Sequence, residues 1–194
     1  MPKEKGANQG GQSAAAAKKA RDERNRKRRA ARAKAARKKK QCNKTVTDKQ
    51  KKHMQENWTP STKVTNMVNN KSPKPLKCAL CGRGAPFALP PPSTKFFKQL
   101  SADHIVPVSQ IVKKPGFACL TPENQKKVLN NPKNFAIPGV CPSCNLSRQD
   151  TKWDKWAGHE TFGITKPGKA FAAKMAGKAP GLSKGLGEQI GKLL

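Results

Sequence analysis

The chain has 194 residues, of which 41 are Lys or Arg and 11 are Asp or Glu, giving a formal net charge of +30. This excess favours a polyanionic partner, most simply a nucleic acid, although charge alone does not separate DNA from RNA or an anionic membrane. Hydrophobic residues make up 35% and Tyr is absent, which excludes a core extending through the whole chain and predicts long disordered parts. No apolar run approaches the ~18 residues of a bilayer span, so we expect no membrane span.

Residues 1–52 form a segment rich in Lys, Arg, Ala, Gln and Gly. Alanine and basic residues favour a helix, but the segment lacks an apolar stripe and its like charges repel. We therefore expect a disordered polybasic tail that can become helical on a phosphate backbone. Its expected nucleic-acid contacts are Arg26, Arg28, Arg29 and Arg32. A solvated tail that only raises solubility and loose affinity is the alternative.

Two further segments flank the centre of the chain. Residues 53–75 read as a polar linker with a short helix between Thr59 and Asn70. Residues 158–194 read as a Gly, Ala and Lys-rich extension. Two short helices are expected there, Ala170 to Ala176 and Leu186 to Leu194, separated by Pro180. The first forty residues contain no apolar segment, so we expect no signal peptide.

Four of the six cysteines form two C-x-x-C pairs, Cys78-Ala79-Leu80-Cys81 and Cys141-Pro142-Ser143-Cys144. A two-residue spacer lets both sulfurs face one ion, and two such turns predict a closed, structural zinc site. Disulfides or an iron–sulfur cluster are the alternatives. Cys42 and Cys119 have no spacing partner and are expected to be free thiols. This pattern favours an intracellular, reducing compartment.

The loop between the pairs carries Asp103-His104-Ile105-Val106-Pro107. Ile and Val favour a strand, which Pro107 limits to an edge or an end. Neighbouring side chains on a strand point to opposite faces, so both Asp103 and His104 serve one site only where the backbone kinks or the strand ends. Asn145 and Arg148 follow the second pair in a predicted short helix, where Asn145 is alternatively only a helix cap.

These motifs in this order resemble the zinc-containing HNH endonucleases, over residues 76–157. The resemblance implies an α+β fold, a small ββα-metal (His-Me finger) domain stapled by the Cys₄ zinc site. It also implies that His104 is the general base, that Asp103 and Asn145 hold a catalytic Mg²⁺ or Mn²⁺, and that Arg148 contacts phosphate. Asn134 resembles the residue that braces the loop and holds the His, making the chain an H-N-N variant. The longer spacing on both sides of Asn134 leaves other candidates for that brace, namely Asn124, Asn130 and Asn131.

The resemblance implies hydrolysis of DNA phosphodiester bonds to a 5′-phosphate and a 3′-hydroxyl. No separate sequence-reading domain is visible, so we expect weak sequence specificity, as in a toxin or effector nuclease delivered into a target cell. The expected partners are DNA and an immunity protein or delivery machinery, with no small-molecule substrate. The alternatives are a zinc-ribbon protein that binds nucleic acid without catalysis, and a structural zinc module whose basic tail binds RNA, ribosomes or membrane.

Overall fold

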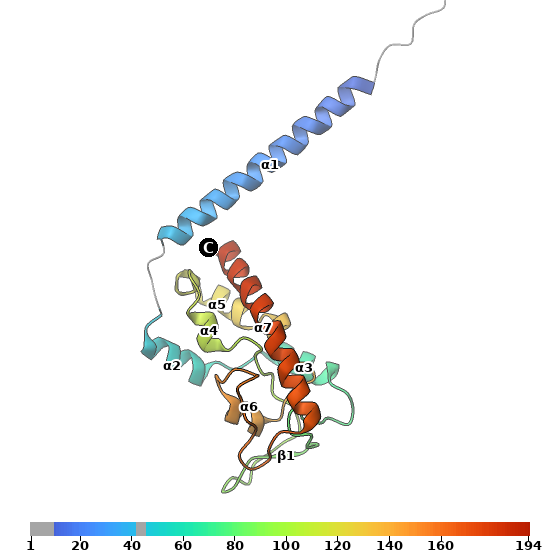
Figure 1. Cartoon of the computed structure of the whole chain (residues 1–194). Coiled ribbons are helices and arrows are strands. Elements are labelled where there is room, and N and C mark those ends of the chain that lie inside the picture. The colour runs from blue at the N-terminus through green and yellow to red at the C-terminus, as the bar shows by residue number, and fades with distance from the viewer. Residues whose placement is uncertain (1–9, 42–45) are drawn as a thin grey trace, which may run out of the picture. The chain divides into compact units, whose positions relative to one another are not determined.

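The computed structural model describes residues 10–41 and 46–194 and divides the chain into two compact units, Met1–Cys42 and Asn43–Leu194 (Figure 1). The second unit combines helices with one small two-stranded sheet, which confirms the predicted α+β class. Among the described residues, the helices are too short or too polar to cross a membrane.

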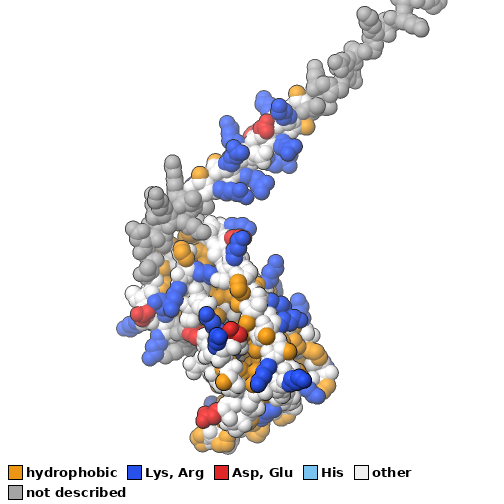
Figure 2. Space-filling model, viewed as in Figure 1, with side chains coloured by type: hydrophobic (Ala, Val, Ile, Leu, Met, Phe, Trp, Pro, Cys, Tyr) orange, Lys and Arg blue, Asp and Glu red, His pale blue; other side chains and the backbone are white. Residues whose placement is uncertain are grey.

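The first unit contains helix α1, Gly10–Gln41, where the sequence predicted disorder. Every described side chain from residue 15 to residue 34 is exposed, including those of Arg26, Arg28, Arg29 and Arg32. Figure 2 shows Lys and Arg side chains along this helix. The prediction of disorder gave too little weight to the high helix propensity of Ala, Arg and Lys. An ion pair of 2.8 Å between Lys27 and Glu23, one turn apart, stabilises the helix further.

The second unit begins with helices α2, Asp48–Asn57, and α3, Thr62–Lys71. Thr47 and Ser61 cap them by accepting hydrogen bonds from backbone N–H groups of the first turns. Helix α3 confirms the short helix predicted in the linker, whereas α2 crosses the boundary predicted at residue 52. The remaining elements are strands β1, Phe87–Ala88, and β2, Phe96–Phe97, helices α4, Val108–Val112, α5, Pro122–Leu129, α6, Pro142–Arg148, and α7, Lys166–Leu193, and the 3-10 turns Phe117–Cys119 and Pro132–Asn134.

Strands β1 and β2 pair antiparallel, with Phe87 opposite Phe97 and Ala88 opposite Phe96. The segments of the D-H motif and of Asn134 also run antiparallel, but their contact consists of isolated bridges, Ser101 with Val140 and His104 with Phe135. The N–H of Ala136 donates to the carbonyl oxygen of Asp103 over 2.9 Å. Prolines at 107 and 138 remove N–H donors where each segment would continue as a regular strand.

Helix α7 is continuous through Pro180, where the sequence predicted two short helices. An internal proline costs about 3 kcal/mol because it removes a hydrogen bond and crowds the preceding turn. Burial offsets this cost: Met175 packs in the cluster around the four cysteines, while Leu186 and Ile190 pack in a second cluster with Phe117. The C-terminal segment is therefore part of the domain core, and the folded unit is larger than the predicted residues 76–157.

Cys119 is disulfide-bonded, so the prediction of a free thiol at this position was wrong. The prediction for Cys42 lies outside the described residues. The four cysteines of the C-x-x-C pairs are free of disulfides. The expectation of an intracellular, reducing compartment stays a prediction.

Candidate metal centre and active site

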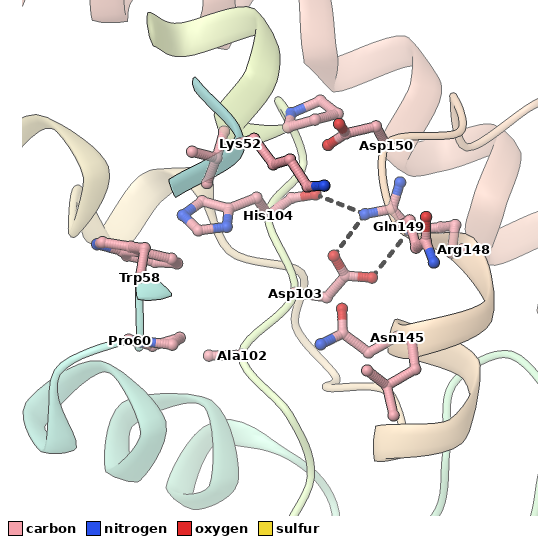
Figure 3. A pocket seen from close by; sticks show the side chains of 13 residues that line it. Lys52, Trp58, Pro60, Ala102, Asp103, His104, Asn145, Arg148, Gln149 and Asp150 are labelled. Carbon is pink, nitrogen blue, oxygen red and sulfur yellow. Dashed lines mark hydrogen bonds and ion pairs between the residues drawn. The ribbon is translucent and has the colours of Figure 1, made fainter. Parts of the chain in front are cut away.

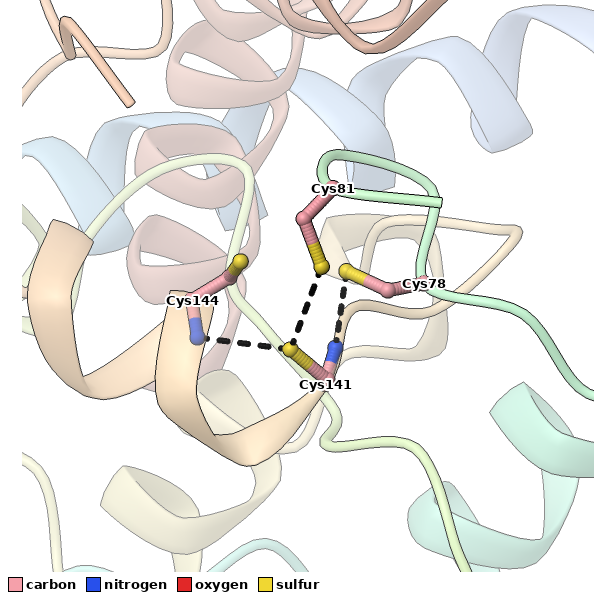
Figure 4. Close-up of side chains that lie close together, drawn as sticks. All are labelled: Cys78, Cys81, Cys141 and Cys144. Carbon is pink, nitrogen blue, oxygen red and sulfur yellow. Dashed lines mark hydrogen bonds between the residues drawn. The ribbon is translucent and has the colours of Figure 1, made fainter. Parts of the chain in front are cut away.

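The four cysteines of the two C-x-x-C pairs lie together and are buried (Figure 4). Their sulfur atoms all lie within 4.8 Å of one another, and those of Cys81 and Cys141 are 3.8 Å apart. A tetrahedral zinc ion with sulfur ligands at about 2.3 Å holds neighbouring sulfurs about 3.8 Å apart. The cluster therefore has the donor type, number and spacing of a structural zinc site, as the sequence predicted.

Local backbone geometry produces the cluster. Gly82, with a φ of +74°, closes the first turn, and its N–H donates to the carbonyl oxygen of Cys78 over 3.0 Å. The second pair begins α6: Cys141 is its N-cap, and its sulfur accepts from the N–H of Cys144. The N–H of Cys141 in turn donates to the Cys78 sulfur over 3.2 Å, which joins the two turns.

Hydrogen bonds among the four thiols shift the pKa values of individual cysteines in opposite directions. Hydrogen bonds from Cys141 and Cys144 lower the pKa of Cys81 to about 7. The hydrogen bond with Cys141 raises the pKa of Cys144 above its ordinary value. Zinc binds cysteine as the thiolate, so a zinc ion held by this cluster would displace the thiol protons.

A pocket of about 600 Å³ lies beside α6, and Figure 3 shows the side chains that line it. Asp103, His104, Asn145 and Arg148 all contribute to its wall. Asp103 and His104 both line this pocket because their segment is not a regular strand. It forms one isolated bridge, at His104, and then turns into α4 after Pro107. The structure therefore brings together the candidate residues of the D-H motif and those of the helix that follows the second C-x-x-C pair.

His104 is a buried residue in the wall of this pocket. Its Nε2 lies 3.0 Å from the carbonyl oxygen of Leu129. A carbonyl only accepts, so Nε2 carries the proton and Nδ1 is left as the acceptor of the neutral ring. The rings of Trp58 and Phe135 lie against it, with centroids 4.3 and 4.5 Å away. This burial lowers the pKa of His104 to about 4, which keeps the imidazole neutral at physiological pH.

Asp103 forms a buried ion pair with Arg148. The guanidinium donates from Nε to Oδ2 over 2.9 Å and from a terminal nitrogen to Oδ1. Arg148 also donates to the carbonyl oxygens of His104 and Thr151, and its guanidinium lies over the ring of Trp153. Burial raises the pKa of Asp103, an effect that the positive charge of Arg148 opposes. In this arrangement Arg148 is directed into the protein, and its predicted contact with phosphate stays a prediction.

Asn134 is fully buried and binds the backbone of the D-H segment through both ends of its amide. Its Oδ1 accepts from the N–H of Val106 over 2.8 Å, and its Nδ2 donates to the carbonyl oxygen of Val106 over 3.0 Å. The alternative bracing residues make other contacts: Asn124 with Leu193, Asn130 with Ser61, and Asn131 with Gln189. Of these four asparagines, Asn134 is the one whose amide holds the D-H segment.

Asn145 stands one residue after Cys144, near the start of α6, so its position is tied to that of the cysteine cluster. Its side chain lines the pocket, and Figure 3 shows its amide pointing toward the Asp103 carboxylate. The N-cap of α6 is Cys141, so the alternative role of Asn145 as that cap is wrong.

Sequence reasoning missed three pocket residues, Lys52, Trp58 and Asp150. Lys52 and Trp58 come from the segment read as tail and linker, and Trp58 was the one signal, a large apolar side chain among polar residues. Asp150 follows Gln149, which has a φ of +46° and turns the chain at the end of α6.

Comparisons of the chain with protein-family models, curated proteins and solved structures gave no match.

Proposed function

We propose that this protein is a metal-dependent endonuclease of the HNH type that hydrolyses phosphodiester bonds in DNA. The observation that carries the proposal is the convergence of His104, Asp103 and Asn145 on one pocket, beside a cluster of four cysteines. In this reading the pairing of residues 101–106 with residues 134–140, with α6 against it, corresponds to the ββα unit of that superfamily.

His104 is the proposed general base. Its Nδ1, the unprotonated nitrogen of the neutral ring, accepts a proton from a water molecule whose oxygen attacks the phosphorus. The bond from phosphorus to the 3′ oxygen breaks, and that oxygen takes up a proton, leaving a 5′-phosphate and a 3′-hydroxyl. The hydrogen bond from Nε2 of His104 to the carbonyl oxygen of Leu129 fixes the tautomer that this step needs. Asn134 holds the adjacent backbone.

Asp103 and Asn145 are the proposed ligands of a divalent cation. Their oxygens suit Mg²⁺ or Mn²⁺, which commonly bind through one or two protein oxygens and complete their coordination with water and phosphate. Each carboxylate oxygen of Asp103 has two lone pairs, so the ion pair with Arg148 leaves acceptor capacity on both. Such an ion, when bound, offsets the charge that builds on the phosphate oxygens during cleavage.

Nucleic-acid affinity is proposed to come from helix α1. Its exposed arginines, Arg26, Arg28, Arg29 and Arg32, offer charge to phosphates without reading base sequence. The same charge would serve the alternative, a zinc-ribbon protein that binds nucleic acid without catalysis. The burial of Asp103 against Arg148 favours that alternative, because a structural ion pair needs no metal and no substrate.

Incubation of the purified full chain with supercoiled plasmid separates the two functions. We expect nicked and linear products with Mg²⁺ or Mn²⁺, and none when His104 is replaced by Ala. Plasmid that is retarded on a gel but stays covalently intact under every metal condition would support the non-catalytic binder instead. Zinc content measured on the same samples shows whether an inactive protein is still folded.

A further inference from the structure

One cation in the pocket wall comes from outside the motifs that the sequence identified. Lys52 lies on α2 and lines the same pocket as His104 and Asn145. The residue is exposed, and Figure 3 shows its side chain reaching into the pocket, with its amino group on the side of Arg148 and Asp150. The wall of the pocket is therefore completed by a helix that neither the D-H motif nor the cysteine pairs include.

Helix α2 holds the backbone of Lys52 in a fixed place. A capping box begins the helix: the side chain of Thr47 accepts from the N–H of Gln50, and the N–H of Thr47 donates to the Gln50 side chain. At the other end, the N–H of Trp58 donates to the carbonyl oxygen of Met54 over 3.1 Å. Met54 and Trp58 both pack against a hydrophobic cluster that includes side chains of α4 and α7. Because the helix is anchored, a ligand has to order only the side chain of Lys52.

Arg148, to which the family resemblance assigned a phosphate contact, is engaged with other partners. Its guanidinium donates two hydrogen bonds to Asp103 and one each to the carbonyl oxygens of His104 and Thr151. The side chain is 1% exposed. A phosphate reaches these N–H groups only if the buried ion pair opens, which would leave the carboxylate of Asp103 uncompensated. Lys52 needs no such rearrangement, because it is exposed and already lies in the pocket wall.

The charge of the pocket wall depends on Lys52. The wall contains two carboxylates, Asp103 and Asp150, and two cations, Lys52 and Arg148, while burial keeps His104 neutral. Without Lys52, two carboxylates would face one guanidinium, and the excess of negative charge would repel an anionic phosphodiester. The ammonium group of lysine binds phosphate as a point charge, with three donors on a flexible stem.

We propose that Lys52 binds the substrate phosphate in this pocket, in the role that the resemblance gave to Arg148. Its ammonium group donates to a non-bridging phosphate oxygen and offsets the negative charge that builds there as water attacks. Lys52 keeps its proton throughout this step. The identification of the ligand as a phosphodiester of DNA rests on the proposed function, whereas binding of a phosphate at Lys52 does not depend on cleavage.

Cleavage of supercoiled plasmid by the full chain, at saturating protein and saturating Mg²⁺ or Mn²⁺, tests this role. A hydrogen bond to a charged group is worth about 10- to 150-fold, so Lys52→Ala should lower the cleavage rate by that factor. Lys52→Arg should restore part of the rate, because it retains the charge. Lys49→Gln is the matched control, since Lys49 is an exposed lysine of the same helix outside the pocket wall, and its rate should match the parent. Equal losses in Lys52→Ala and Lys49→Gln, or no loss in Lys52→Ala, would overturn the proposal.

Two further readouts separate a phosphate contact from a structural role. The metal concentration that gives half the maximal rate should not increase in Lys52→Ala, because removing a positive charge does not weaken the binding of a cation. Thermal melts should match the parent, since the residue is exposed. Asp150→Asn should cut at least as fast as the parent, because it removes a carboxylate that repels the phosphate. Equal losses in Lys52→Ala and Asp150→Asn would overturn the phosphate contact, because Lys52 would then act only through Asp150.

A binding measurement makes the test independent of cleavage. A dinucleoside monophosphate carries one phosphodiester, and its phosphorus NMR signal should shift or broaden when the full chain carrying His104→Ala is added with Mg²⁺. Adding Lys52→Ala to this chain should abolish the change, and adding Lys49→Gln should not. A change that persists without Lys52, or no change with either protein, would overturn the phosphate site. Binding that depends on Lys52 in a protein that never cuts plasmid would leave the site standing while the nuclease proposal fails.

Discussion

Arg148 joins Asp103 across 45 residues of sequence, with hydrogen bonds to both carboxylate oxygens and with both side chains buried. The pair links the D-H segment to the end of α6, the helix that is capped by Cys141 and contains Cys144 of the cysteine cluster. The proposed catalytic carboxylate and the structural cluster are therefore parts of one connected arrangement.

Replacing Arg148 with Met should destabilise the second unit by about 3–5 kcal/mol, because it leaves the buried Asp103 charge without a partner. The double variant Asp103→Asn/Arg148→Met should recover much of this loss, since no unpaired charge remains. Urea unfolding of the parent, both single variants and the double variant measures the coupling. Additive losses would show that the two side chains do not stabilise each other.

The motif residues of the site could be predicted from the sequence, whereas several tertiary contacts that hold them in place could not. The spacing of Cys78 and Cys81 specifies a turn within four residues, and Asn145 takes its place from the neighbouring Cys144. The pairing of Arg148 with Asp103 and the packing of Trp58 on His104 depend on tertiary contacts that no local pattern encodes. Pro180 illustrates the same limit, because burial on both sides of it outweighs its local preference against a helix.

Replacing Cys78 or Cys144 with Ser should unfold the core around the cysteine cluster, because structural zinc contributes folding free energy directly. Metal analysis of the parent should give about one zinc per chain, and a strong chelator should lower its melting temperature. Ser143→Ala is the matched control: it lies between two cysteines but loses only the bond to Ala88, about 1 kcal/mol. A parent protein without zinc and with unchanged stability in chelator would exclude the zinc site.

The stability of the second unit should fall as the pH decreases from about 6.5 to about 4, in part through His104. Its pKa in the folded state is about 4, lowered by burial, and its ordinary value is 6.5. In this window the unfolded chain binds a proton that the folded chain does not, so the free energy of unfolding decreases by about 3 kcal/mol as the pH falls through it.

Urea unfolding at pH 7.5 and pH 4.5 measures this effect, with His104→Gln as the matched variant. Loss of zinc at low pH affects both proteins, so the quantity of interest is the difference between their pH dependences. The parent should lose more stability than His104→Gln. Equal losses would mean that His104 titrates normally in the folded protein.

Removing the arginines of α1 should flatten the salt dependence of DNA binding. The slope of log K against log salt should decrease by about 0.9 for each phosphate contact that is lost. The variant replaces four exposed arginines with Gln: Arg26, Arg28, Arg29 and Arg32. The matched control removes the same charge from exposed positions of α7: Lys166, Lys169, Lys174 and Lys178.

The control should change the slope less than the α1 variant does, and cleavage at saturating protein should survive in both. Equal slopes for the two variants would indicate that net charge alone, without a role for α1, determines affinity. Filter binding from 50 to 200 mM salt gives both slopes.

His104→Ala and Asn145→Ala should fail in different ways, and this difference tests the proposed mechanism. Loss of a positioned general base lowers turnover roughly 10²- to 10⁴-fold. His104→Ala should therefore cut slowly at every metal concentration, with DNA binding nearly unchanged, and higher pH should recover part of the rate by supplying hydroxide. Asn145→Ala should instead require more Mg²⁺ or Mn²⁺, and excess metal should restore part of its activity.

Asn145→His is the mildest change expected at that position, because an imidazole also binds divalent metals, with a shift in the preferred ion. Cleavage rates measured against metal concentration for the three variants give the two signatures, and thermal melts separate them from loss of fold. An Asn145→Ala protein with an unchanged metal requirement would remove this residue from the metal site.

If His104→Ala and Asn145→Ala both cut plasmid as fast as the parent, the pocket between Asp103 and α6 is not the nuclease site. The zinc-ribbon binder would then be the better account of this chain, because the cysteine cluster and the basic helix would remain without a catalytic centre.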